Sequence, residues 1–319
     1  MARIRAFEDA AEEASKGGVS AFGAALSQDV MVRGPLHLST GQEAVPAGVC
    51  ANLFRTDMIT STHRGHGHTL AKGASMEKMM CELFGRATGF NGGKGGSMHI
   101  ADFSVGMLGA NGVVAAGIPI AVGAAHAVRI RSGKEIVACF FGDGAINRGP
   151  FLEGLNWAAI HKLPLLFVCE DNRWSATTAT SAMTAGPGAL ARAQSVGVDG
   201  LAVDGNDVFA VDAAAGSLLA TIRAGGGPKF LHAVTYRFKG HVSVDPATYR
   251  DGQEVARALE NDPMPFAEAK IGAIEAKRIR DEAHAEVKRV VEVATAAPWP
   301  KSDSAYTDIQ DTGAGRWLA

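Results

Sequence analysis

The strongest constraint on the fold of this chain is a strand, helix, strand pattern between residues 136 and 172. Residues 136–141 form an uninterrupted apolar run, which is typical of a strand buried on both faces of a parallel sheet. Apolar side chains then recur at helical spacing over residues 147–161, and residues 165–169 form a second apolar run. Because such crossovers return the second strand parallel to the first, the pattern predicts an α/β fold with a mostly parallel sheet and helices on both faces.

Each predicted strand is followed by a side chain that offers an oxygen donor. Asp143 lies in a Gly-Asp-Gly turn after the first strand, and Asn172 follows the second. Since the carboxyl ends of parallel strands meet at the edge where open α/β sheets bind ligands, both are expected to face one ligand. Hard oxygen donors suit Mg²⁺ or Ca²⁺, and Mg²⁺ commonly shares its coordination with phosphate oxygens. The N–H groups of Gly144 and Ala145 are expected to begin the next helix, where a phosphate is favoured. The pattern predicts a site for Mg²⁺ and diphosphate; a glycine turn with an unrelated Asx turn is the alternative.

A resemblance to a known family rests on residues 142–172, which read GDGAINRGPFLEGLNWAAIHKLPLLFVCEDN. This stretch resembles the thiamin diphosphate motif of transketolase-like enzymes, in which GDG is followed at a similar distance by Asn. More narrowly, it resembles the alpha subunit of the decarboxylating first component of 2-oxo acid dehydrogenase complexes, above all the acetoin dehydrogenase branch. The resemblance implies a thiamin diphosphate-binding (transketolase-like) fold with thiamin diphosphate and Mg²⁺ as cofactors. It also implies that the backbone carbonyl of Trp174 joins Asp143 and Asn172 as a metal ligand.

Two histidine-bearing segments extend this resemblance. Residues 61–68 place three histidines and an arginine among glycines, a spacing that suits a helical zinc site poorly. Arg64 would repel a cation, whereas it could clamp a diphosphate, and histidines could donate to phosphate or to a substrate carbonyl. The resemblance implies that His63 and Arg64 hold the diphosphate, His63 standing where the family commonly has Tyr. It also implies that His66 and His37, the latter in an HLxxGQEA pattern, serve the substrate channel.

Three further segments match the family. The resemblance implies that Gly112 and Val114 support the aminopyrimidine of the cofactor. It also implies that the glycine-rich loop 89–99, ending in the weaker candidate His99, shapes the cofactor pocket and subunit contacts. His241, in a loop after a predicted strand, is implied to reach the reacting end of the cofactor. Taken alone, the glycine-rich stretch could be a linker and His241 an ordinary loop histidine.

The function implied is that of an enzyme active only with a partner subunit. It would cleave acetoin or a related hydroxyketone or diketone and transfer the acyl group to a lipoyl group on a transacetylase. A pyruvate or branched-chain 2-oxo acid dehydrogenase remains an alternative, as does a non-catalytic Mg²⁺-diphosphate scaffold, although intact Asp143, Asn172, Arg64 and His241 disfavour the scaffold. In this family a glutamate of a separate beta subunit activates the cofactor, so an α₂β₂ heterotetramer is expected.

Composition sets wider limits. The chain has 319 residues, of which 20% are charged, and a net charge of −2, so there is no electrostatic case for nucleic acid or an anionic membrane as partner. The four cysteines lie apart in apolar surroundings and predict reduced thiols without a disulfide. The amino terminus lacks an apolar signal region, and no stretch approaches the length of a membrane span. The expectation is a cytoplasmic protein that is neither exported nor embedded in a membrane.

The expected organisation is one large domain with an appendage. Residues 1–263 are expected to form the thiamin diphosphate-binding α/β domain, with the diphosphate and Mg²⁺ half-site, and residues 264–319 a C-terminal helix and an extended arm. The resemblance covers residues 26–265. Other helices are expected from near Gly41 and over residues 115–128 and 207–223, whereas residues 181–200 lack periodicity. The glycine-rich loops 89–97 and 109–112 are expected to need a covering subunit to become ordered.

Overall fold

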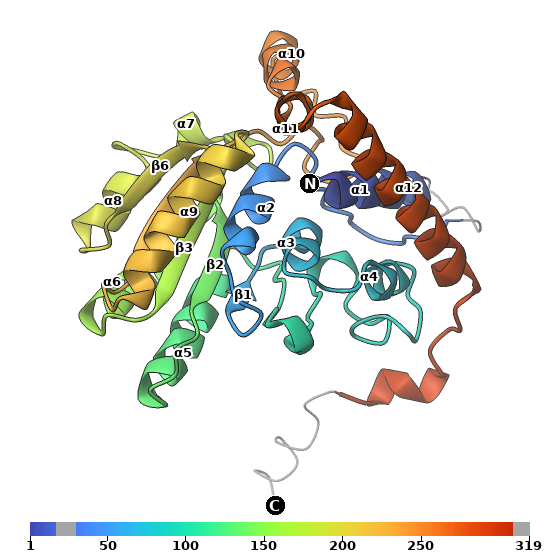
Figure 1. The fold of residues 1–319 in the computed structure, drawn as a ribbon. Helices are drawn as coiled ribbons and strands as arrows, with labels where there is room; N and C mark the ends of the chain where they lie inside the picture. Colours follow the sequence, from blue (N-terminus) through green and yellow to red (C-terminus); the bar gives the residue numbers. More distant parts are fainter. Residues whose placement is uncertain (17–29, 309–319) are drawn as a thin grey trace, which may run out of the picture.

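A five-stranded parallel sheet forms the centre of the molecule (Figure 1). The structure is a computed structural model and describes residues 1–16 and 30–308. The strand order is β1-β2-β3-β7-β6, and all neighbouring pairs are parallel, which confirms the predicted fold class. The strands are β1 (Met58–Thr60), β2 (Val137–Gly142), β3 (Leu165–Asp171), β6 (Gly200–Asp204) and β7 (Lys229–Val234).

Helices cover both faces of the sheet, and β2 shows why its sequence is apolar throughout. Successive side chains of a strand point to opposite faces. Ala138 and Phe140 accordingly join a core with α2 (Ala44–Ala51) and α9 (Val208–Arg223). Val137, Cys139 and Phe141 join a second core on the opposite face. The helices of that face are α5 (Gly117–Ile130), α6 (Gly149–Ile160) and α8 (Ala189–Ser195).

The predicted crossover is present, with its helix starting later than expected. A 3-10 turn, η3 (Asp143–Asn147), follows β2, and α6 begins only at Gly149. Pro150 in the first turn of α6 explains the delay, because its fixed φ suits a helix start and it lacks an N–H group. The prediction that Gly144 and Ala145 begin the main helix is therefore wrong; they lie in the turn. By contrast, the helix expected over residues 207–223 is present as α9, and Asp207 caps it by accepting from the N–H groups of Phe209 and Ala210.

Several boundaries differ from the sequence expectation. The helix expected from near Gly41 begins at Ala44, and no side chain in the described part of the chain caps it; the nearby Ser39 hydroxyl donates to Glu8. Residues 181–200, expected to be irregular, include α8 and the end of α7 (Thr180–Met183). A two-stranded antiparallel ribbon of β4 (Trp174–Ser175) and β5 (Thr178–Ala179) precedes α7.

The C-terminal region contains more helices than expected. After α10 (Gly252–Glu260), the single helix expected from residue 264 is divided into α11 (Pro263–Ile271) and α12 (Ala273–Ala296). Gly272, with φ +88, separates the two, a conformation that glycine adopts without strain. The expected arm contains a 3-10 turn, η4 (Ser302–Tyr306), and its residues 309–319 lie outside the described part.

The remaining helices form a layer beside the sheet. The N-terminal α1 (Ala2–Ser15) packs against α12, and α12 also packs on α4 (Met76–Leu83) (Figure 1). Helix α3 (Gly65–Ala71) packs against α1 and α2. The short turns η1 (Gly96–Met98) and η2 (Phe103–Val105) follow α4. All four cysteines are free and buried, as predicted. None of the helices in the described part has the length and apolar character needed to cross a membrane.

Candidate functional site

A cavity lies at the carboxyl ends of β2 and β3, where the topology predicts a ligand. Loops before α2, α3 and α5, the turn after β3, and the segment after β7 close around it. All candidate residues except His66 and the weaker candidate His99 line this cavity: His37, His63, Arg64, Gly112, Val114, Asp143, Gly144, Ala145, Asn172, Trp174 and His241. Residues more than 200 positions apart in the sequence therefore meet in one place.

The metal side of the cavity is formed by the turns after β2 and β3. Asp143 is only 2% exposed, and its carboxylate accepts a hydrogen bond from the Thr180 hydroxyl. The Asn172 side-chain oxygen accepts from the Trp174 N–H over 3.1 Å, so the Asx turn named as an alternative is present. It does not exclude a ligand role, because an amide oxygen has a second lone pair. Between them Arg173 has φ +71, an unusual conformation for this residue type that turns the chain so that both neighbours line the cavity.

Burial of Asp143 has an electrostatic cost that a cation would offset. Desolvation is the main cause that raises the pKa of Asp143 to about 6, against the opposing hydrogen bond from Thr180. A divalent cation would favour the ionised form of the carboxylate. The carboxylate of Asp143, the amide oxygen of Asn172 and a nearby backbone carbonyl are the hard donors that Mg²⁺ prefers. These residues therefore fit the metal that the resemblance implies.

The cavity wall also carries positive charge. Arg64 and Arg237 are both almost fully buried. Burial, followed by the repulsion from neighbouring arginines, lowers the pKa of Arg64 to about 9 and that of Arg237 to about 10. Gln42 Nε2 and His37 Nδ1 are also buried and have no hydrogen-bond partner among the described residues. Two buried cations and two buried polar atoms without described partners around one cavity favour an anionic ligand such as a diphosphate.

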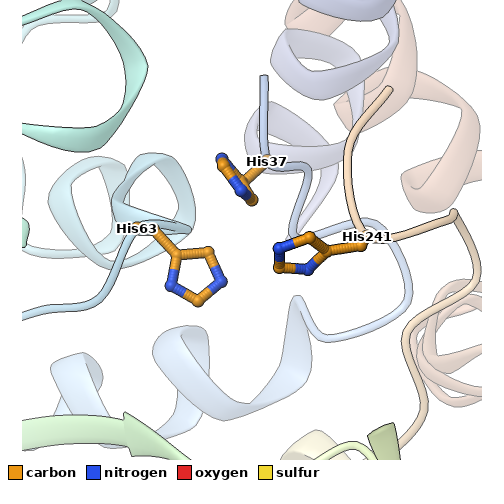
Figure 2. Close-up of side chains that lie close together, drawn as sticks. All are labelled: His37, His63 and His241. Carbon is orange, nitrogen blue, oxygen red and sulfur yellow. The ribbon is translucent and has the colours of Figure 1, made fainter. Parts of the chain in front are cut away.

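Three histidines from separate segments converge in this cavity (Figure 2). The ring centroid of His37 lies 4.6 Å from that of His63 and 4.9 Å from that of His241. Burial, and then the charge of Arg64, lowers the pKa of His37 to about 3, of His63 to about 2 and of His241 to about 4. At neutral pH each ring is therefore uncharged and offers one donor and one acceptor.

The three rings also offer a possible set of metal ligands, since one nitrogen of each lies within 4.8 Å of the others. The surrounding charge argues against a cation at this point. Arg64 Nη2 lies 3.3 Å from His241 Nδ1, and Arg237 lines the same cavity. We therefore assign the rings of His37, His63 and His241 to hydrogen bonding and proton transfer.

The expected channel role of His66 is wrong. Its side chain is fully buried between Glu8 and Ser97 and does not line the cavity. The reason is local: α3 begins at Gly65, so His66 is the first helical side chain to point toward α1, where its ring packs edge-on against Phe7 at 5.5 Å. His99 also lies outside the cavity lining, and its side chain is exposed. Its neighbour Met98 lines the cavity instead.

The glycine-rich loop is organised by a residue of the same chain. The buried Glu82 carboxylate accepts hydrogen bonds from the N–H groups of Asn91, Gly93, Gly95 and Gly96. A side chain at Gly93 would collide with the backbone of residue 85, so glycine is required there. Contacts within the chain therefore shape residues 89–97, and the need for a covering subunit stays a prediction.

Gln42 and Arg237 are among the cavity residues that were missed from the sequence. Gln42 follows the loop of His37 and accepts a hydrogen bond from Asn172, and Arg237 precedes the loop of His241. Both lie inside segments whose histidines were singled out. Their positions in the sequence could have revealed them. Gln42 is a polar residue just before a helix, and Arg237 follows a strand that ends at the ligand-binding edge of the sheet.

Comparison with known proteins gives a consistent result. The model of the family described as "Dehydrogenase E1 component" matches residues 20–303. The alpha subunit of acetoin:2,6-dichlorophenolindophenol oxidoreductase from Bacillus subtilis is 40% identical over 97% of this chain and 91% of its own length. The protein of the same name from Cupriavidus necator is 42% identical over 87% of this chain and 86% of its own length. The alpha subunit of the pyruvate dehydrogenase E1 component from Rhizobium meliloti is 38% identical over 87% of this chain and 82% of its own length.

Proposed function

The chain belongs to the dehydrogenase E1 component family, and on that premise we propose that it is the alpha subunit of an enzyme that cleaves acetoin or a related hydroxyketone or diketone. Family membership makes the protein a thiamin diphosphate-dependent oxidoreductase and removes the scaffold alternative. The observation that carries the proposal is the single cavity that Asp143 and Asn172 line together with the buried Arg64 and Arg237.

We assign the cofactor contacts as follows. Asp143, Asn172 and the backbone carbonyl of Trp174 hold Mg²⁺. Arg64 and the unpartnered Nε2 of Gln42 would hold the diphosphate. The N–H groups of Gly144 and Ala145 and the ring of His63 would add further hydrogen bonds to it. Gly112 and Val114 support the aminopyrimidine. The positions of all these residues on the wall of the cavity support the assignment.

Thiamin diphosphate, when bound, would supply a nucleophilic carbon and an electron sink for carbon–carbon cleavage next to a carbonyl. The chain itself orients the reactants and manages protons. His37, His63 and His241 are neutral at pH 7, so each ring could donate a hydrogen bond to a carbonyl oxygen or accept a hydroxyl proton. His66 acts on the cavity only through other residues.

The substrate proposal rests on charge as well as on relatives. A 2-oxo acid carries a carboxylate that needs a cationic partner, whereas acetoin is uncharged. Arg64 donates to the backbone carbonyls of Leu38 and His241, over 2.7 and 2.9 Å. Arg237 donates to the carbonyls of Lys239 and Ala176. With both guanidinium groups committed to the chain and the diphosphate, the three neutral rings favour an uncharged ketone.

The exposed surface of α5 and α6 supports a partner subunit. These two helices pack together and expose large apolar side chains, and Val113 and Val114 directly before α5 continue the apolar surface to the cavity. Apolar faces of this kind usually mark interaction sites. We define the α5/α6 face by its exposed residues Ile120, Ile130, Leu152, Trp157 and Ile160.

We propose that a beta subunit covers the α5/α6 face and completes the cofactor site in an α₂β₂ assembly. The acyl acceptor is then a lipoyl group on a transacetylase component. Four free cysteines are consistent with a reducing cytoplasm, where we place the assembly.

A dye-linked reductive assay of the assembled enzyme over a substrate panel tests the proposed function. The panel contains acetoin, diacetyl, pyruvate and a branched-chain 2-oxo acid. We expect the highest kcat/KM for acetoin or diacetyl, dependent on thiamin diphosphate. A clear preference for pyruvate or the branched acid would overturn the substrate assignment while leaving the cofactor assignment in place.

A further inference from the structure

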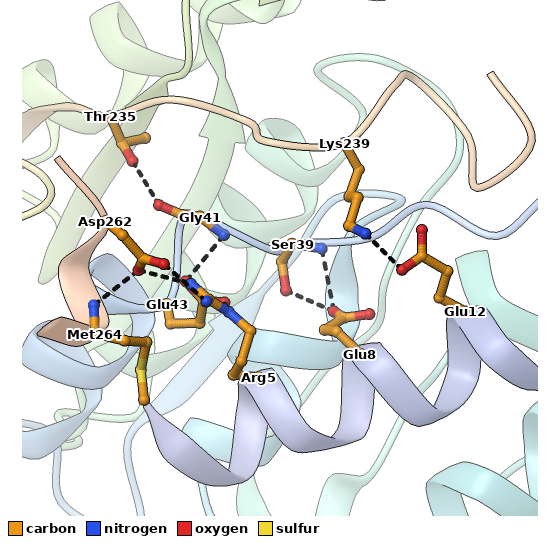
Figure 3. Close-up of polar contacts among 10 residues, drawn as sticks. All are labelled: Arg5, Glu8, Glu12, Ser39, Gly41, Glu43, Thr235, Lys239, Asp262 and Met264. Atoms are coloured by element: carbon orange, nitrogen blue, oxygen red, sulfur yellow. Dashed lines mark hydrogen bonds and ion pairs between the residues drawn. The ribbon is translucent and has the colours of Figure 1, made fainter. Parts of the chain in front are cut away.

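One face of α1 contacts the loops that carry the cavity histidines (Figure 3). Arg5, Glu8, Glu12 and Ser15 recur at spacings of three or four residues, so they lie along one side of the helix. No residue of α1 lines the cavity. The helix therefore acts on the cavity from behind.

Glu8 makes the most central of these contacts. Its side chain is fully buried. It accepts hydrogen bonds from the Ser39 N–H and hydroxyl, at 3.1 and 2.6 Å, and from His66 Nδ1 at 3.0 Å. Ser39 lies two residues after His37, and His66 lies two residues after Arg64. One carboxylate thus joins the two segments that bring His37 and Arg64 to the cavity.

The rest of the same helix face holds the third segment. Lys239 donates to Glu12 over 2.6 Å, and the hydroxyls of Ser15 and Ser243 lie 3.2 Å apart. These contacts flank His241 on both sides in the sequence. Arg5 adds an ion pair to Glu43, which in turn accepts from the Gly41 N–H over 3.0 Å.

The contact of His66 with Ser97 raises a different possibility. Ser97 Oγ lies 3.0 Å from His66 Nε2, so Ser97, His66 and Glu8 are connected like the triad of a serine hydrolase. A nucleophile must reach its substrate, but Ser97 is buried and does not line the cavity. The connection therefore serves position and not a second reaction.

We propose that Glu8 is a positioning residue of the active site, whose ionised carboxylate fixes the His37 segment against the Arg64 segment and supplies negative charge behind Arg64. The inference rests on the proposed function for its catalytic consequence. It concerns a residue that touches neither cofactor nor substrate.

The electrostatics support an ionised Glu8. Burial alone would raise its pKa, but the pairing with His66 and the hydrogen bonds from Ser39 outweigh burial and lower the pKa. The charge of Glu8 in turn opposes the burial and the Arg237 repulsion that lower the pKa of Arg64. A neutral amide would keep an acceptor for Ser39 while losing this charge.

The test compares Glu8→Gln with Glu13→Gln in the assembled enzyme. Glu13 lies on the same helix, is exposed, and pairs only with Lys16 among the described residues. For Glu8→Gln we expect kcat to fall at least tenfold, the KM for the ketone to change less than threefold, and the pH profile of kcat to shift. We expect Glu13→Gln to match the wild type. Ser39→Ala, a milder change to the same network, is expected to lower kcat by a smaller factor if Glu8→Gln fails to fold.

Imidazole nitrogen NMR of His66 provides a readout independent of activity. In the wild type we expect a His66 Nδ1 signal typical of a hydrogen bond to a carboxylate. Glu8→Gln should shift this signal, and Glu13→Gln should leave it unchanged. Wild-type kcat in both Glu8→Gln and Ser39→Ala would overturn the inference, as would a His66 signal that Glu8→Gln leaves unchanged. If the wild type itself has no activity on any ketone, the proposed function fails, while the NMR result still decides the Glu8 contact.

Discussion

The side-chain amide of Asn172 donates to the side-chain oxygen of Gln42 over 3.0 Å, although the two residues are 130 positions apart. This bond fixes which way the Asn172 amide points, because its nitrogen faces Gln42 and its oxygen is left for the Trp174 N–H and a metal. The segment before α2 thereby sets the orientation of a proposed ligand at the end of β3.

Removing this bond is expected to weaken metal binding. Hydrogen-bond partners that orient a ligand typically contribute about 10- to 100-fold in metal affinity. For Gln42→Ala we expect a loss of Mg²⁺ affinity of that order, measured by titrating Mg²⁺ into the assembled protein with saturating thiamin diphosphate. Unchanged Mg²⁺ affinity in Gln42→Ala would show that Asn172 keeps its orientation without Gln42.

A single methyl group at residue 144 is expected to disturb the cofactor site. A Cβ at Gly144 would collide with the Ser175 hydroxyl oxygen and lie 2.9 Å from Ser175 Cβ. Gly144→Ala should therefore weaken thiamin diphosphate binding, and adding Ser175→Gly should restore part of it. Gly252→Ala, where no atom lies within 4 Å of the added Cβ, is the control. Equal cofactor affinity in Gly144→Ala and the control would show that the turn shifts without cost.

Acid should destabilise the chain through the three cavity histidines. Their pKa values in the fold are about 3, 2 and 4, whereas an unfolded histidine titrates at about 6.5. Below pH 7 the unfolded state thus binds more protons, and the free energy of unfolding falls as pH falls toward 4. In urea unfolding at pH 7.5 and 5.5, we expect a smaller loss for His63→Gln than for the wild type. His284→Gln, on the exposed face of α12, is the control and should lose as much stability as the wild type. An equal loss in His63→Gln would contradict the prediction.

Cofactor activation is expected to need the partner. The chain alone should show negligible exchange of the cofactor C2 proton by NMR, and exchange should appear when a cognate beta subunit is added. Trp157→Glu on the α5/α6 face should prevent this, because a charge would be buried against the partner. Leu259→Glu, on exposed α10, is the matched control. Rapid exchange in the isolated chain would mean that one of its own carboxylates activates the cofactor.

The sequence predicted the parts of the site that follow from periodicity and local pattern. The apolar runs around Asp143 and Asn172 place both residues at strand ends, so the topology alone brings them to one edge. The resemblance added His37, His63 and His241, all of which line the cavity. These residues are recognisable because each lies in a short sequence motif that can be identified without the fold.

The rest depended on packing that no local pattern contains. Glu8 looks like one of several charged residues near the amino terminus, and only the folded chain shows it fully buried against Ser39 and His66. His66 was misplaced because the start of α3 decides which way its side chain points. Long-range contacts of this kind override local preferences.

The measurement that tests the central claim most directly is calorimetric titration of thiamin diphosphate, with and without Mg²⁺, into the assembled wild type, Asp143→Ala and Asn172→Ala. We expect tight Mg²⁺-dependent binding in the wild type and a loss of about 100-fold or more in each variant, because each removes a direct oxygen donor. The fold should remain intact by circular dichroism, and Asp143→Ala should not lower the stability of the cofactor-free protein, since burial of this carboxylate is unfavourable. Unchanged cofactor affinity in both variants would contradict the account.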